Sequence, residues 1–137
     1  MYKQIMVPVD LGHLDQLGKA LSTAADLAAH YKISVCYVAV GPATPTEVAH
    51  NPTEFAEKLN AFAVDQSKSH GQQTSAKAYT SADPATDLDD VLLKAVSELG
   101  ADLVVMASHI PTVADYIWPS NGGKIASHAE TSVFLVR

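Results

Sequence analysis

The hydrophobic positions of this chain follow two patterns that take turns along the sequence. Four short runs are almost continuously apolar, and a fifth stretch alternates weakly between apolar and polar residues. Such runs predict strands, most of them buried on both faces of a sheet. We expect strands over 3–9, 33–40, 73–80, 102–107 and 132–136.

Between these runs the apolar residues recur every three or four positions, which is typical of amphipathic helices. We expect helices over 14–30, 52–69, 88–99 and 121–129. Pro52 suits the first position of the second helix, and Gly100 suits the position just after the third. The segment 108–119 shows no regular pattern.

Strands that alternate with helices along a chain favour right-handed crossovers and a parallel sheet covered by helices on both faces. The sequence therefore predicts an α/β protein of the three-layer, doubly wound type with a five-stranded parallel sheet. With 137 residues and no internal repeat or low-complexity segment, residues 1–137 are expected to form a single domain.

The composition limits which partners the protein can bind and in which cellular compartment it is expected. Hydrophobic residues make up 47% of the chain, which is enough for a core, and the formal net charge is −6. That sign disfavours binding to nucleic acid. The single cysteine, Cys36, cannot form a disulfide within the chain, which favours a reducing compartment. The chain has no apolar run of about 20 residues and no secretory signal pattern, so we expect a cytoplasmic protein without membrane insertion.

Asp10 is the first candidate for chemistry. It follows Pro8 and Val9 at the end of the first predicted strand. In doubly wound sheets, ligands bind outside the carboxyl ends of the strands, at the point where the strand order reverses. A carboxylate there can accept hydrogen bonds from a sugar hydroxyl or a base amine. The alternative is that Asp10 caps or turns the chain before the first helix.

Other familiar site patterns are missing from the sequence. It contains neither the P-loop motif nor a G-x-G-x-x-G motif after the first strand, which disfavours a Walker ATPase or a dinucleotide dehydrogenase. The six histidines lack metal-ligand spacing, so no metal site is predicted. Among them only His109, just after the fourth strand, lies near the expected site. Cys36 is interpreted as a small core residue.

The two ends of the chain carry a more specific signal. The first strand reads IMVPVD, and the C-terminal third contains VMASH at 105–109, PSN at 119–121, HA at 128–129 and SVFLVR at 132–137. These segments resemble the universal stress protein family, in particular its F/G-type subgroup. The resemblance extends over the whole chain in element order and is weakest from about 41 to 85.

This resemblance implies the strand order 3-2-1-4-5, the adenine nucleotide alpha hydrolase-like fold. It also implies a homodimer in which the last strands of two subunits meet. The apolar character of that strand agrees with a covered edge, because exposed apolar edge strands invite aggregation. The residues implied at the interface are Val133, Phe134, Leu135 and Val136.

Many members of the family bind ATP through three glycines and a hydroxyl residue between the fourth strand and the last helix. In this chain Ala107, Ile110 and Pro119 take the places of the glycines, and Ser120 supplies the hydroxyl. Proline has no N–H group, so one charge-assisted bond to phosphate would be lost, worth roughly 1.5–3 kcal/mol or about 10- to 100-fold in affinity. Asp115 adds a negative charge to the same loop, and Lys124 is a nearby cation.

The resemblance thus implies an ATP- or AMP-binding site with a weakened phosphate loop, and Mg²⁺ would accompany ATP. Its adenine and ribose contacts are implied at Pro8, Asp10, Val40 and Met106. The full set of candidate ligand-binding residues is Pro8, Val9, Asp10, Val40, Met106, Ala107, His109, Ile110, Pro119, Ser120 and Asn121.

Three functions are compatible with this pattern. The first is a dimeric stress protein that binds an adenine nucleotide and is not an enzyme. The second is a dimeric adaptor that acts through protein partners and has lost the nucleotide. The third, a slow ATP hydrolase, ranks last because no recognisable motif positions a general base or a set of Mg²⁺ ligands.

Overall fold

The computed structural model describes residues 1–107, 121–128 and 130–137. Its strands are β1 (Gln4–Pro8), β2 (Ser34–Pro42), β3 (Thr74–Ser81), β4 (Leu103–Ala107) and β5 (Ser132–Val136). Its helices are α1 (Gly18–Tyr31), α2 (Pro52–His70), α3 (Pro84–Leu99) and α4 (Asn121–His128), with a short 3₁₀ turn, η1 (Leu14–Gln16), before α1.

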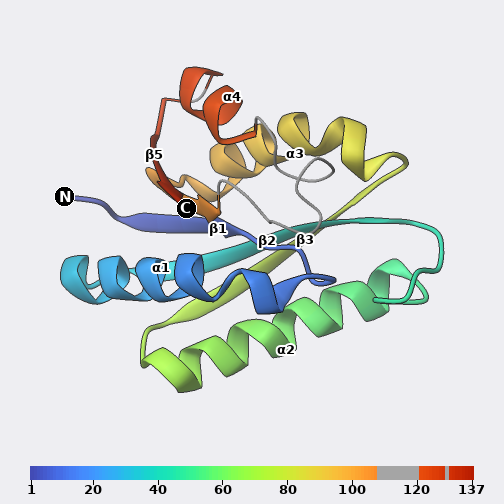
Figure 1. The fold of residues 1–137 in the computed structure, drawn as a ribbon, viewed down its shortest axis with the longest axis horizontal. Coiled ribbons are helices and arrows are strands. Elements are labelled where there is room, and N and C mark those ends of the chain that lie inside the picture. Colours follow the sequence, from blue (N-terminus) through green and yellow to red (C-terminus); the bar gives the residue numbers. More distant parts are fainter. Residues whose placement is uncertain (108–120, 129) are drawn as a thin grey trace.

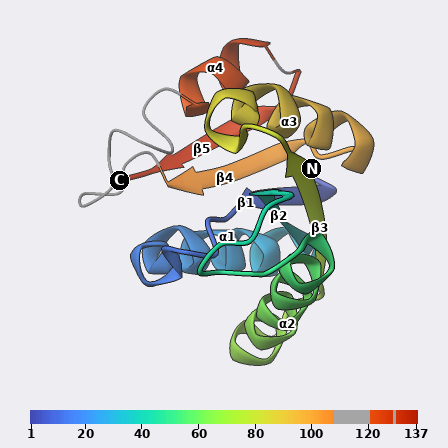
Figure 2. The same ribbon diagram turned by 90° about the vertical axis from the view of Figure 1, so that its right-hand side faces the viewer.

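The five strands form one parallel sheet in the order β3-β2-β1-β4-β5, which confirms the predicted fold and strand order. Helices α1 and α2 cover one face of the sheet, and α3 and α4 cover the other (Figures 1 and 2). β1 lies in the centre, and the order of the strands reverses between β1 and β4. Because all five strands are parallel, their carboxyl ends lie at one edge of the sheet, and a ligand is expected at that edge beside the end of β1.

The central strands form the core of the molecule. β1 and β4 are buried almost throughout, and Ile5, Met6, Val104 and Val105 are fully covered by the helices. A strand buried on both faces cannot alternate apolar with polar residues, which is why these runs are continuously apolar. β3 lies at one edge of the sheet and is only partly buried, in agreement with its weak pattern.

Two helices, α2 and α3, begin in the same way, and both start at the edge of the sheet formed by the carboxyl ends of the strands. Asn51 and Asp83 accept hydrogen bonds from the N–H groups of Glu54 (2.8 Å) and Thr86 (3.3 Å), and each is followed by a proline. These N-caps satisfy donors that the first turn of a helix leaves free. The cap at Asp83 places the start of α3 four residues before the apolar stripe that predicted it.

The segment 14–30 differs from its prediction. A single helix was expected, but the chain forms the η1 turn first and α1 begins only at Gly18. Leu17 separates the two, with φ −100° and ψ 2°, and its side chain is buried. This sparsely populated backbone conformation bends the chain and lets Leu17 reach the core.

The register of β1, β4 and β5 is fixed by Asp102, just before β4. Its carboxylate accepts hydrogen bonds from the N–H groups of Lys3 and Gln4, at 3.0–3.1 Å. Its carbonyl oxygen accepts one from the Ser132 N–H group. One residue thus joins three strands that are distant in the sequence.

β5 forms the other edge of the sheet. Phe134 and Leu135 are 46% and 44% exposed, whereas Val136 is buried and Val133 is half-buried. Of the four residues predicted at a dimer interface, two are therefore available on the surface of the protomer. In the described part of the chain, no helix has both the length and the apolar character needed to cross a membrane.

Candidate functional site

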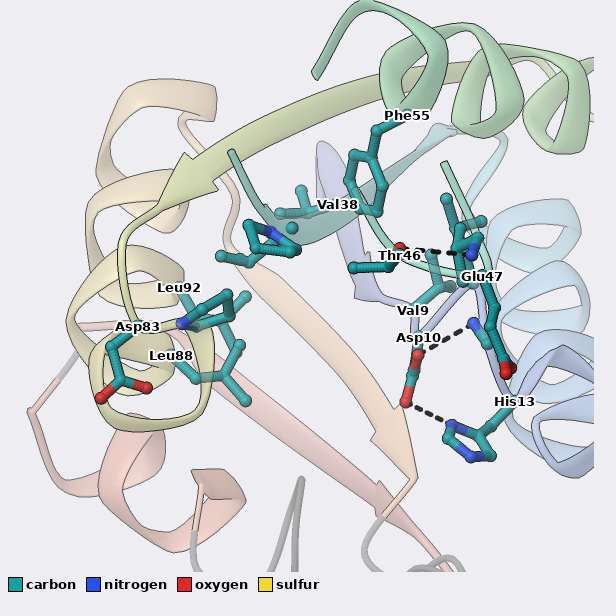
Figure 3. A pocket seen from close by; sticks show the side chains of 17 residues that line it. Val9, Asp10, His13, Val38, Thr46, Glu47, Phe55, Asp83, Leu88 and Leu92 are labelled. Carbon is teal, nitrogen blue, oxygen red and sulfur yellow. Dashed lines mark hydrogen bonds and ion pairs between the residues drawn. The ribbon is translucent and has the colours of Figure 1, made fainter. Parts of the chain in front are cut away.

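A pocket of about 600 Å³ opens at the carboxyl ends of β1 and β2. Three segments enclose it: the turn after β1, the loop between β2 and α2, and the first turns of α3 (Figure 3). Its lining comprises Val9, Asp10, Leu11, Gly12, His13, Val38, Val40, Gly41, Pro42, Thr46, Glu47, Val48, Phe55, Asp83, Pro84, Leu88 and Leu92. Most of these side chains are apolar, and the charged groups lie at its two ends.

Asp10 lies at one end of the pocket and holds the turn after β1. Its Oδ1 accepts a hydrogen bond from the Gly12 N–H group at 3.0 Å, and its Oδ2 lies 2.7 Å from His13 Nδ1. The Asp10 side chain is 19% exposed and that of His13 is 31% exposed. Asp10 thus serves the chain as a turn residue, and each carboxylate oxygen retains a lone pair for a ligand donor.

The loop from 43 to 51 forms the outer wall of the pocket. Thr46 organises it, because its hydroxyl oxygen accepts hydrogen bonds from the N–H groups of Val48 (3.2 Å) and Ala49 (3.3 Å). Ala49 is buried, and Lys58 of α2 donates a hydrogen bond to the Val48 carbonyl oxygen. These contacts fasten the loop to α2 and leave Glu47 exposed on the pocket side.

The opposite wall is the start of α3. Leu88 and Leu92 present buried apolar surface to the pocket, and Asp83 and Pro84 stand at its rim. Both oxygens of the Asp83 carboxylate are engaged locally, one with the Thr86 N–H group and the other with the Thr86 hydroxyl at 2.8 Å. The N-terminus of α3 is therefore satisfied by the protein's own carboxylate.

Gly41 and Phe55 shape the middle of the pocket. A Cβ atom at Gly41 would lie 2.8–3.0 Å from three ring carbons of Phe55, closer than side chains pack. Glycine is required here because the ring approaches the backbone of β2 directly. Phe55 is 9% exposed, so the ring belongs both to the core and to the pocket wall.

We expect Gly41→Ala to lower the free energy of unfolding by about 1–3 kcal/mol, because the Phe55 ring must shift within a packed core. Denaturant unfolding of the variant checks this. Gly18→Ala is the matched control, since Gly18 is the first residue of α1 and nothing lies within 4 Å of the place that an added methyl group would take. An equal and negligible effect of the two substitutions would contradict the close contact at Gly41.

The structure brings some of the sequence-predicted site residues together. Val9, Asp10 and Val40 line the pocket. Pro8 is the last residue of β1, and Met106 and Ala107 are the last two of β4. Met106 and Ala107 are 1% and 8% exposed. None of these three residues lines the pocket. Asn121 begins α4. His109, Ile110, Pro119 and Ser120 lie outside the described residues.

Two further expectations concern reactive groups. Cys36 is 2% exposed, and burial raises the pKa of its thiol, so the side chain stays protonated and packs as a core residue. Within 1–107, 121–128 and 130–137, no group of three histidine, cysteine or acidic side chains is arranged to hold a metal ion.

Sequence reasoning missed much of the pocket wall. It gave His13 no role, although a histidine three residues after Asp10 is a usable signal in a turn after a strand. Phe55, Leu88 and Leu92 lie in the segments predicted as helices, 52–69 and 88–99, and their helical period gave no indication of a pocket. No sequence feature marked Glu47 and Asp83 as pocket residues, because their place in the pocket depends on how two loops fold against each other.

Comparison with known proteins gives one consistent answer. A model of the universal stress protein family matches residues 1–137. "Universal stress protein G" of Shigella flexneri is 29% identical over 148 aligned residues, which include all of both chains. The same name and identity apply to the protein of Escherichia coli O157:H7.

Solved structures of the same fold include nucleotide complexes. A universal stress protein from Archaeoglobus fulgidus has a TM-score of 0.71 at 20% identity, with complete coverage of both chains. The protein from that organism in complex with dAMP has a TM-score of 0.69 at 18% identity, covering 99% of this chain and 98% of its own. A family member from Arabidopsis thaliana with AMP bound has a TM-score of 0.65 at 17% identity, covering 98% and 90%. At these identities the likeness concerns the fold.

Proposed function

The chain belongs to the universal stress protein family, and from that premise we propose that it is a dimeric, non-enzymatic module that binds an adenine nucleotide beside Asp10. The observation that carries this proposal is the pocket itself. A largely apolar cavity of about 600 Å³ lies at the carboxyl ends of β1 and β2 and has a partly exposed carboxylate at one end. Its size and apolar lining suit a small aromatic ligand held by a few polar groups.

Different walls of the pocket would contact different parts of the nucleotide. Val9 and the half-buried Val40 offer apolar surface to a purine ring, and Leu88 and Leu92 close the cavity from the side of α3. Asp10 would accept hydrogen bonds from the ribose hydroxyls or from the base amine. Family members of the same fold hold dAMP and AMP, which supports an adenine compound as the ligand here.

The phosphates of a nucleotide would extend toward the segment between β4 and α4. The resemblance assigns this task to Ala107, Ile110, Pro119, Ser120 and Asn121, where proline and isoleucine replace glycines of the family motif. Fewer backbone N–H groups are then available to the phosphates than in relatives with the full motif. We therefore propose that adenosine contributes most of the affinity, and that Mg²⁺ would enter only with ATP.

The proposed dimer pairs two copies of β5 at the edge of the sheet. Phe134 and Leu135 together form an exposed apolar edge on the protomer, and a β-strand at an edge has unpaired N–H and C=O groups. A second β5 strand would cover the two side chains and pair with these backbone groups.

Titration calorimetry of nucleotide-stripped protein with ATP, ADP, AMP and adenosine tests the proposed function. We expect saturable micromolar binding of at least one adenine compound, with and without Mg²⁺. GTP and guanosine are the matched control ligands, because they differ in the base alone. If no adenine compound binds up to millimolar concentration, the proposal fails and the family fold serves here as an adaptor for protein partners.

A further inference from the structure

We propose that this pocket selects an uncharged nucleoside over its phosphorylated forms, so that each added phosphate weakens binding. This inference rests on the proposed function and deepens it by naming the class of ligand. The inference follows from the distribution of charge around the pocket and does not depend on the loss of the motif glycines.

The charged groups that line the pocket are nearly all acidic. Asp10, Glu47 and Asp83 are carboxylates, His13 is paired with Asp10, and no lysine or arginine of the described residues belongs to the lining. Figure 3 shows Asp10, His13 and Glu47 at one end and Asp83 with Leu88 and Leu92 at the other. A phosphate entering from either end would therefore approach a carboxylate, which raises its energy.

Two lysines, one on α2 and one on α4, are already committed to other groups. Lys58 lies behind the loop wall, donates to the Val48 carbonyl oxygen, and lies 3.5 Å from Glu54 Oε1. Lys124, in the first turn of α4, forms an ion pair with Asp89 of α3 at 3.2 Å. Neither charge is left to balance the carboxylates of the pocket.

Two other sources of positive potential are also weak. The N-terminus of α3 would attract an anion through its free N–H groups, but the Asp83 carboxylate occupies that position and Pro84 has no N–H group. The sequence between β4 and α4, residues 108–120, contains one aspartate, one histidine and neither lysine nor arginine. Residues 108–120 thus supply no lysine or arginine to a phosphate group, and Lys124 beyond them is paired with Asp89.

The size of the pocket agrees with a ligand that needs no phosphate. The apolar walls can remove a purine ring from water, and Asp10 can accept from two hydroxyl groups at most at short distance. A nucleoside satisfies these features and brings no charge to the acidic rim. The same chemistry would favour a cationic adenine derivative and disfavour a triphosphate free of Mg²⁺.

Salt dependence distinguishes this proposal from an ordinary phosphate site. We expect adenosine to bind more tightly than AMP, and AMP more tightly than ATP, in calorimetric titrations at about 0.02 M NaCl. Raising NaCl to about 0.3 M shortens the screening length from roughly 20 Å to roughly 6 Å. The ATP affinity should then rise about three- to tenfold, while that of adenosine changes by less than about twofold.

Single substitutions that remove or reverse a negative charge show which residues weaken ATP binding. Glu47→Lys should raise the affinity for ATP about three- to tenfold relative to the affinity for adenosine, because Glu47 lines the pocket, is exposed and makes no hydrogen bond or ion pair in the described part of the chain. Asp83→Asn should act in the same direction and keep the helix cap, since asparagine is as good an N-cap as aspartate. Glu57→Lys, on the exposed surface of α2 and outside the pocket lining, is the matched control.

The outcomes separate the two proposals. If ATP binds more tightly than adenosine and loses affinity with added salt, the charge inference is wrong and the proposed nucleotide function stands. If the affinity for ATP responds equally to Glu47→Lys and Glu57→Lys, the effect belongs to the net charge of the protein and the inference is also wrong. If no adenine compound binds, both proposals fail.

Discussion

Replacing Asp10 with asparagine is expected to weaken adenosine binding about 10- to 100-fold, because the ligand loses a charged acceptor and meets an amide instead. A hydrogen bond to a charged group contributes roughly 1.5–3 kcal/mol, and its loss gives this factor. Calorimetric titration of the variant with adenosine measures the change.

The substitution is mild for the fold. Asparagine keeps an oxygen that can accept from the Gly12 N–H group, which is the bond that forms the turn after β1. Asp15→Asn is the matched control, since Asp15 lies in the neighbouring η1 turn, is exposed and is not part of the pocket lining. Equal adenosine affinities of the wild type and Asp10→Asn would remove Asp10 from the proposed site.

The same variant links the nucleotide proposal to the charge inference. Asp10→Asn also removes one negative charge from the pocket, which favours ATP. The loss of affinity should therefore be smaller for ATP than for adenosine. A uniform loss for both ligands would mean that the carboxylate acts only through its hydrogen bonds and that its charge is screened.

Much of the fold could be predicted because it follows from short-range patterns. Continuous apolar runs such as that of β4 occur where a strand is covered on both faces, and the order of strands and helices leaves few topologies. The rule that ligands bind at the carboxyl ends of parallel strands then led to Asp10 from the sequence alone. The break at Leu17 was not predictable, because a buried leucine fits a helix equally well by its period.

The pocket wall was harder to predict because side chains meet there from segments distant in sequence. The strand was predicted to end at residue 40, but β2 continues through Gly41 to Pro42, and the glycine makes room for the Phe55 ring. Glu47 and Asp83 belong to different loops, and neither loop has a hydrophobic period that fixes its path. Their shared negative charge can be related to ligand binding only after the fold places both residues around one cavity.

The predicted interface gives the second large effect. We expect Phe134→Glu to convert the proposed dimer into monomers, raising the dimer dissociation constant by about 10²- to 10⁴-fold. At a two-fold axis both copies bring the new charge into the same apolar surface, and an unpaired buried charge costs roughly 3–5 kcal/mol. Multi-angle light scattering across a dilution series measures the change in mass.

The control for this variant uses another exposed apolar residue. Val64 on α2 is 50% exposed, close to the 46% of Phe134 and the 44% of Leu135, but α2 packs against β3 and β2 and not against β5. Val64→Glu should leave the dimer intact, and circular dichroism should show that both variants keep their secondary structure. Because Phe134 is half-exposed on the protomer, its replacement does not open the core. A stable dimer of Phe134→Glu would therefore place the interface elsewhere, and a wild type that is monomeric at every concentration would reject the dimer itself.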